Sequence, residues 1–370
     1  MTTNLLRLEP QKRLYSLDAL RGFDMFWITG GGEPVIAVLQ ILGCAGAIGP
    51  QFHHVEWEGF HFCDLIFPLF MFVAGVAIPY SLKSLREKEV PRQKMLLKAF
   101  RRLVFLVLLG IMYNGLLQTG FQNVRFPSVL GQIGVAYFLA TVIVIYFKSF
   151  RSWFFWLGGI LVGIGIIQLL VPVPGFGAGV LTPEGCINGY IDRMILPGRL
   201  NGGIFDPEGI LCCLSATGIS LMGAIAGNIL LREKIGDWKK LLYFTVAGIS
   251  FIAVAILLSP VYPIIKSCCT STFSLLSGGI GLLLLSLFYL IIDHWGYRKW
   301  AFFFRVIGMN SIFIYLFTRI VDVHTISNFF LGSLATLFGE YGNLLLSLGD
   351  LFLVWSLLYY MYKKKIFLRV

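Results

Sequence analysis

Long apolar segments separated by short polar connections dominate this chain. Runs of about 20 apolar residues recur between Ala19 and Tyr362, and this is the length that an α-helix needs to cross the hydrocarbon core of a bilayer. The pattern predicts ten spans, at residues 18–44, 60–82, 103–120, 126–146, 153–171, 209–231, 241–259, 271–293, 300–321 and 343–362. We therefore expect an all-α, polytopic membrane protein with about ten transmembrane helices.

One membrane domain accounts for nearly all of the sequence. We expect a cytoplasmic N-terminal segment at 1–17, a transmembrane domain at 18–362 and a basic cytoplasmic tail at 363–370. The first apolar run is too long for a secretory signal peptide, so we expect the N-terminus to be retained. The composition agrees, because 57% of the residues are hydrophobic and only 13% are charged, with a mean hydropathy of +0.80.

The distribution of basic residues predicts the orientation. Alternate connections hold 23 of the 30 Lys and Arg residues, whereas the other connections hold four: Arg125, Arg193, Arg199 and Lys266. Cytoplasmic connections carry such an excess, so we expect a multi-pass protein of the cytoplasmic (inner) membrane with both termini in the cytoplasm. The net charge of +11 lies in clusters between apolar runs rather than on a soluble face, which argues against nucleic acid as a partner.

The predicted outer connections hold most of the candidate functional residues. The connection 172–208 is long for a helix connector and contains a glycine-rich stretch at 174–179. Connections of this length are usually functional, although a passive cover is the alternative.

Histidines and acidic residues concentrate before the second predicted span. Fourteen residues contain three of the five histidines and three carboxylates: His53, His54, His61, Glu56, Glu58 and Asp64. Imidazole shuttles protons near neutral pH, and a carboxylate can fix its tautomer. A metal site is one rival interpretation and interfacial packing is another, but no second His or Cys cluster completes a metal site. The seven cysteines show no CxxC or zinc spacing and fit small apolar positions, so we expect no metal.

Ionisable residues also occur inside predicted spans. Asp64 is predicted about four residues inside the second span, where a carboxylate is costly unless it is paired or faces a cavity. In the first span, Asp18, Arg21 and Asp24 are spaced so that the arginine can pair along one helical face. A structural ion pair is therefore the alternative to a functional role.

Two further polar motifs have a structural and a functional interpretation. Asp206, Pro207 and Glu208 suit the N-cap, first position and first turn of the sixth span, so capping alone could explain them. Asn310 is an amide inside the ninth span, where it could bond across helices or bind a ligand.

Short motifs follow one another in a definite order along most of the chain. They are residues 13–22 (RLYSLDALRG), 54–59 (HVEWEG), 64–68 (DLIFP), 125–133 (RFPSVLGQI), 190–193 (YIDR), 206–209 (DPEG), Lys266 and 308–311 (GMNS). Each motif alone is weak, but together and in this order they resemble the transmembrane acyltransferase family that includes lysosomal heparan-alpha-glucosaminide N-acetyltransferase and its bacterial relatives.

This resemblance implies both chemistry and site residues. It implies an acyltransferase domain, acetyl-CoA as acetyl donor, His54 as the catalytic residue and Asp64 as its partner. Residues implied to bind the substrate or CoA are Arg21, Asp24, Glu56, Trp57, Arg125, Gln132, Asp206, Glu208, Lys266 and Asn310. A homodimer is a further family-level expectation.

The expected activity is transfer of an acetyl group from cytoplasmic acetyl-CoA to an amino sugar of the glucosamine type, or a glycan, on the outer side. His54 would act as a nucleophile through acetyl-imidazole or as a base, and both remain open. One alternative is an O-acetyltransferase of envelope polysaccharide, because residues 16–22 also resemble another membrane acyltransferase family. The other is a transporter or permease with Asp24, Asp64 and Asp350 as coupling sites.

Overall fold

The computed structural model describes residues 14–120 and 124–368, and within these ranges it is helical without β-strands. The helices are α1 (Tyr15–Phe26), η1 (Trp27–Gly31), α2 (Gly32–Ile41), α3 (Ala45–Ile48), η2 (Gly49–Phe52), α4 (Phe62–Glu87), α5 (Arg92–Tyr113), α6 (Leu116–Thr119), α7 (Val129–Tyr146), α8 (Phe150–Leu170), α9 (Ile187–Ile195), α10 (Ile210–Leu231), α11 (Asp237–Leu258), α12 (Ser271–Phe288), η4 (Tyr289–His294), α13 (Ala301–Gly308), α14 (Ser311–Ile320), α15 (Val323–Leu337), η5 (Gly339–Tyr341) and α16 (Gly342–Lys363). The predicted all-α polytopic fold is confirmed. Most of the predicted cytoplasmic segment 1–17, and the last two residues of the tail, lie outside the described residues.

The number of spans differs from the predicted ten. By length and apolarity, seven helices in the described ranges can cross a membrane: α4, α7, α8, α10, α11, α12 with η4, and α16 with η5. An eighth span is formed if α13 and α14 count as one. α5 is missing from this set because it begins at Arg92, and its first half contains five basic residues. The predicted span at 103–120 begins after these charges and therefore starts eleven residues later than α5.

Two predicted continuous spans are broken in the middle. The first predicted span, at 18–44, bends where Thr29 (φ −92°, ψ 19°) and Gly30 (φ 101°) leave the helical conformation. A positive φ of this kind favours glycine. The ninth one bends by 74° between α13 and α14, next to Asn310. Irregular backbone at membrane depth is tolerated where it lines a cavity, and both breaks adjoin the cavity described below.

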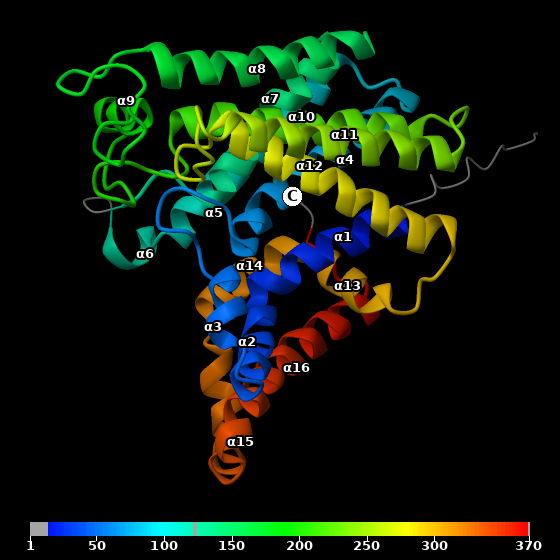
Figure 1. Cartoon of the computed structure of the whole chain (residues 1–370). Coiled ribbons are helices and arrows are strands. Elements are labelled where there is room, and N and C mark those ends of the chain that lie inside the picture. The colour runs from blue at the N-terminus through cyan, green and yellow to red at the C-terminus, as the bar shows by residue number, and fades with distance from the viewer. Residues whose placement is uncertain (1–13, 121–123, 369–370) are drawn as a thin grey trace, which may run out of the picture.

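Close helix packing holds the centre of the bundle, where α10 lies against α4 (Figure 1). A Cβ atom on Gly75 of α4 would lie 2.0 Å from the carbonyl oxygen of Ser220, and one on Gly223 of α10 would lie 2.1 Å from that of Phe72. Small residues let membrane helices approach in this way. These contacts hold the middle of α4, the helix whose first turn carries Asp64, in the core of the bundle.

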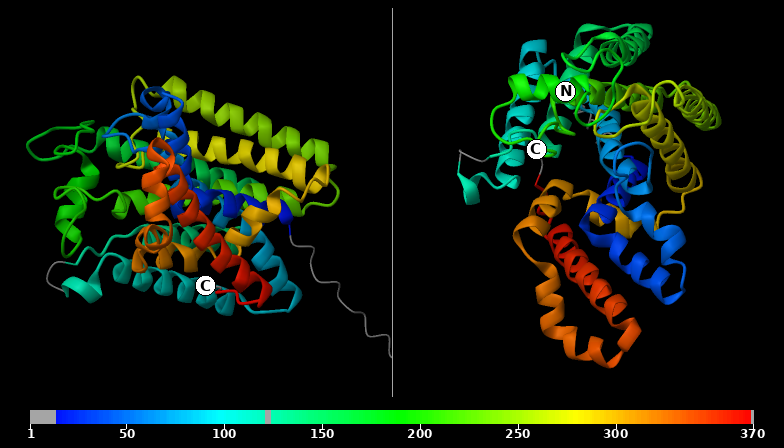
Figure 2. Two further views of the ribbon diagram at one scale, coloured as in Figure 1. Left: turned by 90° about the horizontal axis from the view of Figure 1, so that it is seen from below. Right: turned by 60° about the vertical axis from the view of Figure 1, so that its left-hand side comes forward.

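The connections divide between two ends of the main bundle. α6 and α9 lie at one end, and the turn between α10 and α11 lies at the other (Figure 1). α2, α15 and α16 form an arm that extends away from this bundle, as Figure 2 also shows. α15 was not predicted, because its 15 residues are too few for a span and include polar side chains.

Candidate active site

The candidate site starts from the first turn of α4. Because this helix begins at Phe62, Asp64 is its third residue rather than lying four residues deep. The Asp64 side chain is fully buried, and its Oδ2 atom accepts backbone N–H bonds from His61 (3.0 Å) and Val55 (3.4 Å). A carboxylate is favoured at this positive end of a helix. The bonds fix Oδ2, so Oδ1 is left for partners outside the helix.

His54 and Lys266 are the partners of Oδ1. His54 Nδ1 lies 2.7 Å from Asp64 Oδ1, and Lys266 Nζ lies 3.2 Å from the same oxygen. Lys266 Nζ also lies 2.9 Å from Nδ1 and 3.3 Å from Nε2 of the His54 ring. We call these three residues the histidine cluster. If Nδ1–H donates to Asp64, the Nε2 atom is free for chemistry.

Lys266 comes from a distant part of the chain. The segment before α4 lies antiparallel to the connection between α11 and α12, with the Gly59 N–H donating to the Ile264 carbonyl at 2.9 Å and Glu58 opposite Ile265. This contact places Lys266 over His54, a proximity that was not predicted, because the family resemblance implied only that Lys266 binds the substrate or CoA.

The hydrogen bond with Asp64 raises the pKa of His54 to about 9, and a hydrogen bond with Cys63 contributes in the same direction. Partial burial and the positive charge of Lys266 act against this increase. The imidazole is therefore mainly protonated at neutral pH, and the histidine cluster carries two cations for one carboxylate.

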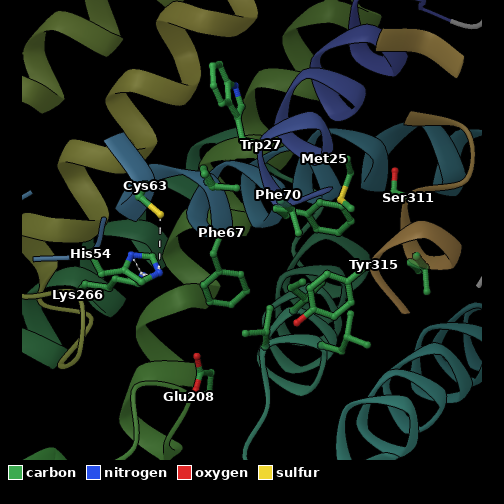
Figure 3. Close-up of a pocket in the computed structure, with 16 residues that line it drawn as sticks. Met25, Trp27, His54, Cys63, Phe67, Phe70, Glu208, Lys266, Ser311 and Tyr315 are labelled. Carbon is green, nitrogen blue, oxygen red and sulfur yellow. Dashed lines mark hydrogen bonds between the residues drawn. The ribbon is translucent and has the colours of Figure 1, made fainter. Parts of the chain in front are cut away.

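A cavity of about 350 Å³ opens beside the histidine cluster (Figure 3). This volume falls within the range of small-molecule sites, roughly 300–1,000 Å³. The wall is mainly apolar and is formed by Met25, Trp27, Ile28, His54, Cys63, Ile66, Phe67, Phe70, Val129, Leu130, Ile133, Glu208, Lys266, Ser311, Ile312 and Tyr315. Neither His53 nor His61 is part of the wall, and His61 Nδ1 instead bonds to the His53 carbonyl at 2.9 Å.

A second cluster of charges, the arginine cluster, reaches the same cavity. Arg125 binds Asp206 through two hydrogen bonds, Nε to Oδ2 at 2.8 Å and Nη2 to Oδ1 at 2.6 Å, and it also contacts the Glu208 carboxylate. Asp206 is fully buried and accepts further N–H bonds from the backbone of Asn201 (2.9 Å) and Glu208 (3.0 Å). Of the three charged side chains, Glu208 is the one on the cavity wall.

The interpretation of Asp206 as an N-cap is wrong. α10 begins at Ile210 after Gly209, which is too far from Asp206, and the Ile210 N–H donates to Asp192 Oδ1 at 3.0 Å. Asp192 reaches this helix end from α9. Pairing with Arg125 therefore replaces capping as the structural role of Asp206.

The two carboxyl groups of the arginine cluster differ in their affinity for protons. Burial acts to raise the pKa of Asp206, but its bonds with Arg125 and the backbone hold that pKa below the ordinary value. Burial raises the pKa of Glu208 to about 7 even though Arg125 opposes this shift. Glu208 is thus a group on the cavity wall that exchanges a proton near neutral pH.

The other predicted site residues lie outside the cavity wall. Arg21 lies 3.6 Å from Asp18, whereas Asp24 is fully buried without a hydrogen-bond partner for either oxygen in the described part of the chain. Gln132 donates to the Cys212 carbonyl at 3.1 Å, and Asn310 bonds to the backbone of residues 366–368.

The two remaining predicted binding residues lie in the segment between η2 and α4. Glu56 is exposed, and Trp57 donates to the Leu181 carbonyl at 2.7 Å within the connection 172–208. Trp57 therefore attaches that connection to the segment carrying His54. The binding roles of these residues, and of Arg21, Asp24, Gln132 and Asn310, stay predictions.

The wall also holds three polar side chains that were not among the predicted site residues. Cys63 directly precedes Asp64 but was interpreted as a small apolar residue, and Ser311 and Tyr315 reach the cavity only because α13 and α14 are bent. Tyr315 also stacks on Tyr113, with ring centroids 4.6 Å apart. Within residues 14–120 and 124–368, no group of three or more His, Cys, Asp or Glu side chains could hold a metal ion.

The fold and this site together define a multi-pass helical membrane protein with an acid–base cluster beside a cavity. Residues 13–118 match a protein family described as a domain of unknown function (DUF5009). The chain is 28% identical to the heparan-alpha-glucosaminide N-acetyltransferase of Homo sapiens, over 85% of this chain and 54% of that protein. It is 26% identical to the enzyme of Mus musculus, over 85% and 55%. The similarity predicted from the motifs is confirmed, and the chain spans about half the length of these relatives.

Proposed function

We propose that this chain is a membrane-embedded acetyltransferase that transfers an acetyl group from acetyl-CoA to an amino sugar on the outer side of the membrane through His54. The observation that carries the proposal is the cavity, whose wall holds His54, backed by Asp64 and Lys266, and also holds Glu208. The names of the two similar mammalian proteins support the same chemistry.

The histidine cluster suits the thioester of the donor. Attack on a thioester places negative charge on its carbonyl oxygen, and a fixed cation such as Lys266 stabilises that charge in a site shielded from water. Asp64 orients the His54 ring and stabilises its protonated form. His54 then serves as the proton-transfer residue or as the nucleophile.

The arginine cluster suits the amine of the acceptor. An amino sugar arrives largely as an ammonium ion and must lose a proton before its nitrogen can attack. Glu208, with a pKa of about 7, can bind the ammonium ion and accept this proton on the cavity wall. We assign Glu208 as the acceptor-binding residue and Arg125 with Asp206 as the pair that holds it.

The opposite end of the bundle suits the nucleotide of CoA. Three adjoining cavities of about 540, 580 and 650 Å³ lie there, with basic side chains in each wall: Lys83, Arg86, Arg92, Lys98, Arg101, Arg102, Lys148 and Arg232. Basic side chains of this kind bind phosphates. The bilayer then separates the donor from the acceptor, and residues 18–362 form the acyltransferase domain.

The proposed orientation places these basic cavities in the cytoplasm and His54 near the outer face of the inner membrane, with both termini inside. Single cysteines introduced at residues 84–98 should react with membrane-impermeant reagents only from the cytoplasm, and a cysteine at position 56 only from outside. Labelling of both positions from the same side would overturn this orientation.

The activity is tested with the purified protein in detergent, radiolabelled acetyl-CoA and a series of acceptors. The proposal predicts acetylated glucosamine and CoA release in equal amounts, with no product from sugars that carry only hydroxyl groups. Acetylation of hydroxyl sugars instead would identify a polysaccharide O-acetyltransferase. No transfer to any acceptor, combined with uptake of a solute into vesicles, would favour a transporter.

A further inference from the structure

Cys63 completes an arrangement of three side chains around His54. Its Sγ atom lies 3.8 Å from His54 Nε2 (Figure 3). The other ring nitrogen, Nδ1, lies 2.7 Å from Asp64 Oδ1. A nucleophile, an imidazole and a carboxylate in this order are the arrangement by which cysteine enzymes form acyl intermediates. Contacts of this kind are often loose before a substrate binds.

We propose that Cys63 carries the acetyl group between donor and acceptor as an S-acetyl thioester, with His54 as its acid–base partner. This inference rests on the proposed acetyl transfer and assigns a more specific role to His54. The ring moves protons for Cys63, and it is not itself acetylated.

The position of Cys63 supports a nucleophilic thiolate. It is the second residue of α4, a helix of 26 residues, and the positive end of a helix stabilises a thiolate. The cation Lys266 lies on the same cavity wall. His54, with a pKa of about 9, is mainly an imidazolium at neutral pH, which is the form that pairs with a thiolate. Direct attack by the imidazole would need the scarce neutral form.

The other cysteines lack this environment. Cys186, Cys212, Cys268 and Cys269 are buried in the protein, and none of the six cysteines besides Cys63 lines the cavity. Cys63 is half-buried and reaches the cavity together with His54. A substrate can therefore meet this thiol without any opening of the core.

The first half of the reaction moves the acetyl group onto the enzyme. Cys63 starts as a thiolate beside the His54 imidazolium, and its sulfur attacks the carbonyl carbon of acetyl-CoA. The bond between this carbon and the CoA sulfur breaks, and the imidazolium gives its proton to the leaving CoA thiolate, which leaves the ring neutral. One thioester is exchanged for another, with free CoA as the product.

The second half moves the acetyl group to the acceptor. The uncharged amine attacks the carbonyl carbon on Cys63, and His54 accepts the proton that the nitrogen loses. The carbon–sulfur bond to Cys63 breaks, which restores the Cys63 thiolate beside the His54 imidazolium. If the amine binds as an ammonium ion, its extra proton passes first to Glu208 and then to water.

The test is to trap the intermediate. Purified protein is mixed with radiolabelled acetyl-CoA without acceptor, denatured in acid and digested, and the peptide containing residues 62–64 is analysed by mass spectrometry. We expect one acetyl group on Cys63 that is stable in acid, is released by neutral hydroxylamine and disappears when glucosamine is added before the quench. Cys44→Ala, which changes an exposed cysteine, is the matched control and should keep the label.

Cys63→Ala should lose the label and at least a hundredfold in transfer rate, while Cys63→Ser, which keeps the size of the side chain, controls for folding through its thermal unfolding temperature. Full transfer by Cys63→Ala would overturn the inference, as would a label retained on His54 in that variant. These outcomes leave the proposed function intact. If the wild-type protein releases no CoA with any acceptor, the proposed function fails, and the Cys63 intermediate fails with it.

Discussion

The two charged clusters on the cavity have opposite compositions. The histidine cluster contains two groups that can be cations, His54 and Lys266, around one carboxylate. The arginine cluster contains one cation, Arg125, between two carboxyl groups. One part of the wall therefore favours negative charge in a bound ligand and the other favours positive charge, although each cluster is built around a fully buried aspartate.

The two clusters also differ in the side chain that pairs with the buried aspartate. Asp206 binds a guanidinium that stays charged at any physiological pH, so this pair is a fixed structural element. Asp64 binds an imidazole that gains and loses a proton, and the side chain of His54 is 58% exposed. Removal of His54 or Lys266 should therefore mainly affect catalysis, whereas removal of Arg125 or Asp206 should mainly affect stability.

The largest expected effect is the loss of transfer in His54→Ala. We expect a decrease of about a hundredfold to ten-thousandfold, because the variant lacks the proton-transfer group, while its unfolding temperature stays close to that of the wild type. His53→Ala and His61→Ala should retain substantial activity, since neither side chain lines the cavity. Transfer is measured with radiolabelled acetyl-CoA and glucosamine in detergent. Normal turnover by His54→Ala beside an inactive His53 or His61 variant would show that the site is assigned to the wrong histidine.

The next largest effect is the difference in stability between variants of Arg125 and Lys266. Arg125→Ala leaves a buried Asp206 without its partner and should lower the free energy of unfolding by about 3–5 kcal/mol. Lys266→Met leaves His54 to balance the buried Asp64, so it should cost less stability than Arg125→Ala while clearly slowing transfer. Denaturant unfolding and initial rates of both variants provide the comparison. Equal stability losses would remove the distinction between the clusters.

Asp206→Asn should have a smaller effect than Arg125→Ala. If Asp206 were a helix cap, asparagine would replace it without loss of stability, because its side chain still accepts the backbone bond. Since the structure pairs Asp206 with Arg125, we expect a loss of about 1.5–3 kcal/mol, the range for hydrogen bonds to charged groups. Wild-type stability in this variant, measured by denaturant unfolding, would mean that Glu208 alone satisfies Arg125.

The smallest effect is a shift in the pH dependence of the rate. The imidazolium of His54 is needed to protonate the leaving CoA, so the rate should fall as the pH rises through the pKa of about 9. Asp64→Asn removes the carboxylate that contributes most to this pKa, and it should move the fall to lower pH. A wild-type rate that instead rises through pH 9 and stays high would indicate attack by the neutral imidazole.

Local sequence patterns predicted the fold class, and the family resemblance implied the pair of His54 and Asp64 that the structure places in contact. The length and periodicity of the apolar runs identify the helices. His54 and Asp64 are only ten residues apart, so one short segment of the chain brings their side chains together. The breaks at Gly30 and Asn310 were missed, because an apolar run looks the same whether or not the helix bends. Cys63 was missed because its role depends on where its thiol points, and Asp206 was misjudged because its partner lies 81 residues away.

Transfer across a sealed membrane tests the central claim most directly. Vesicles with the native orientation of the protein are loaded with radiolabelled acetyl-CoA, and glucosamine is supplied outside only. The account predicts labelled N-acetylglucosamine outside the vesicles with the wild-type protein and none with His54→Ala inserted at the same density. No labelled product with the wild-type protein, or equal product with both proteins, would contradict it.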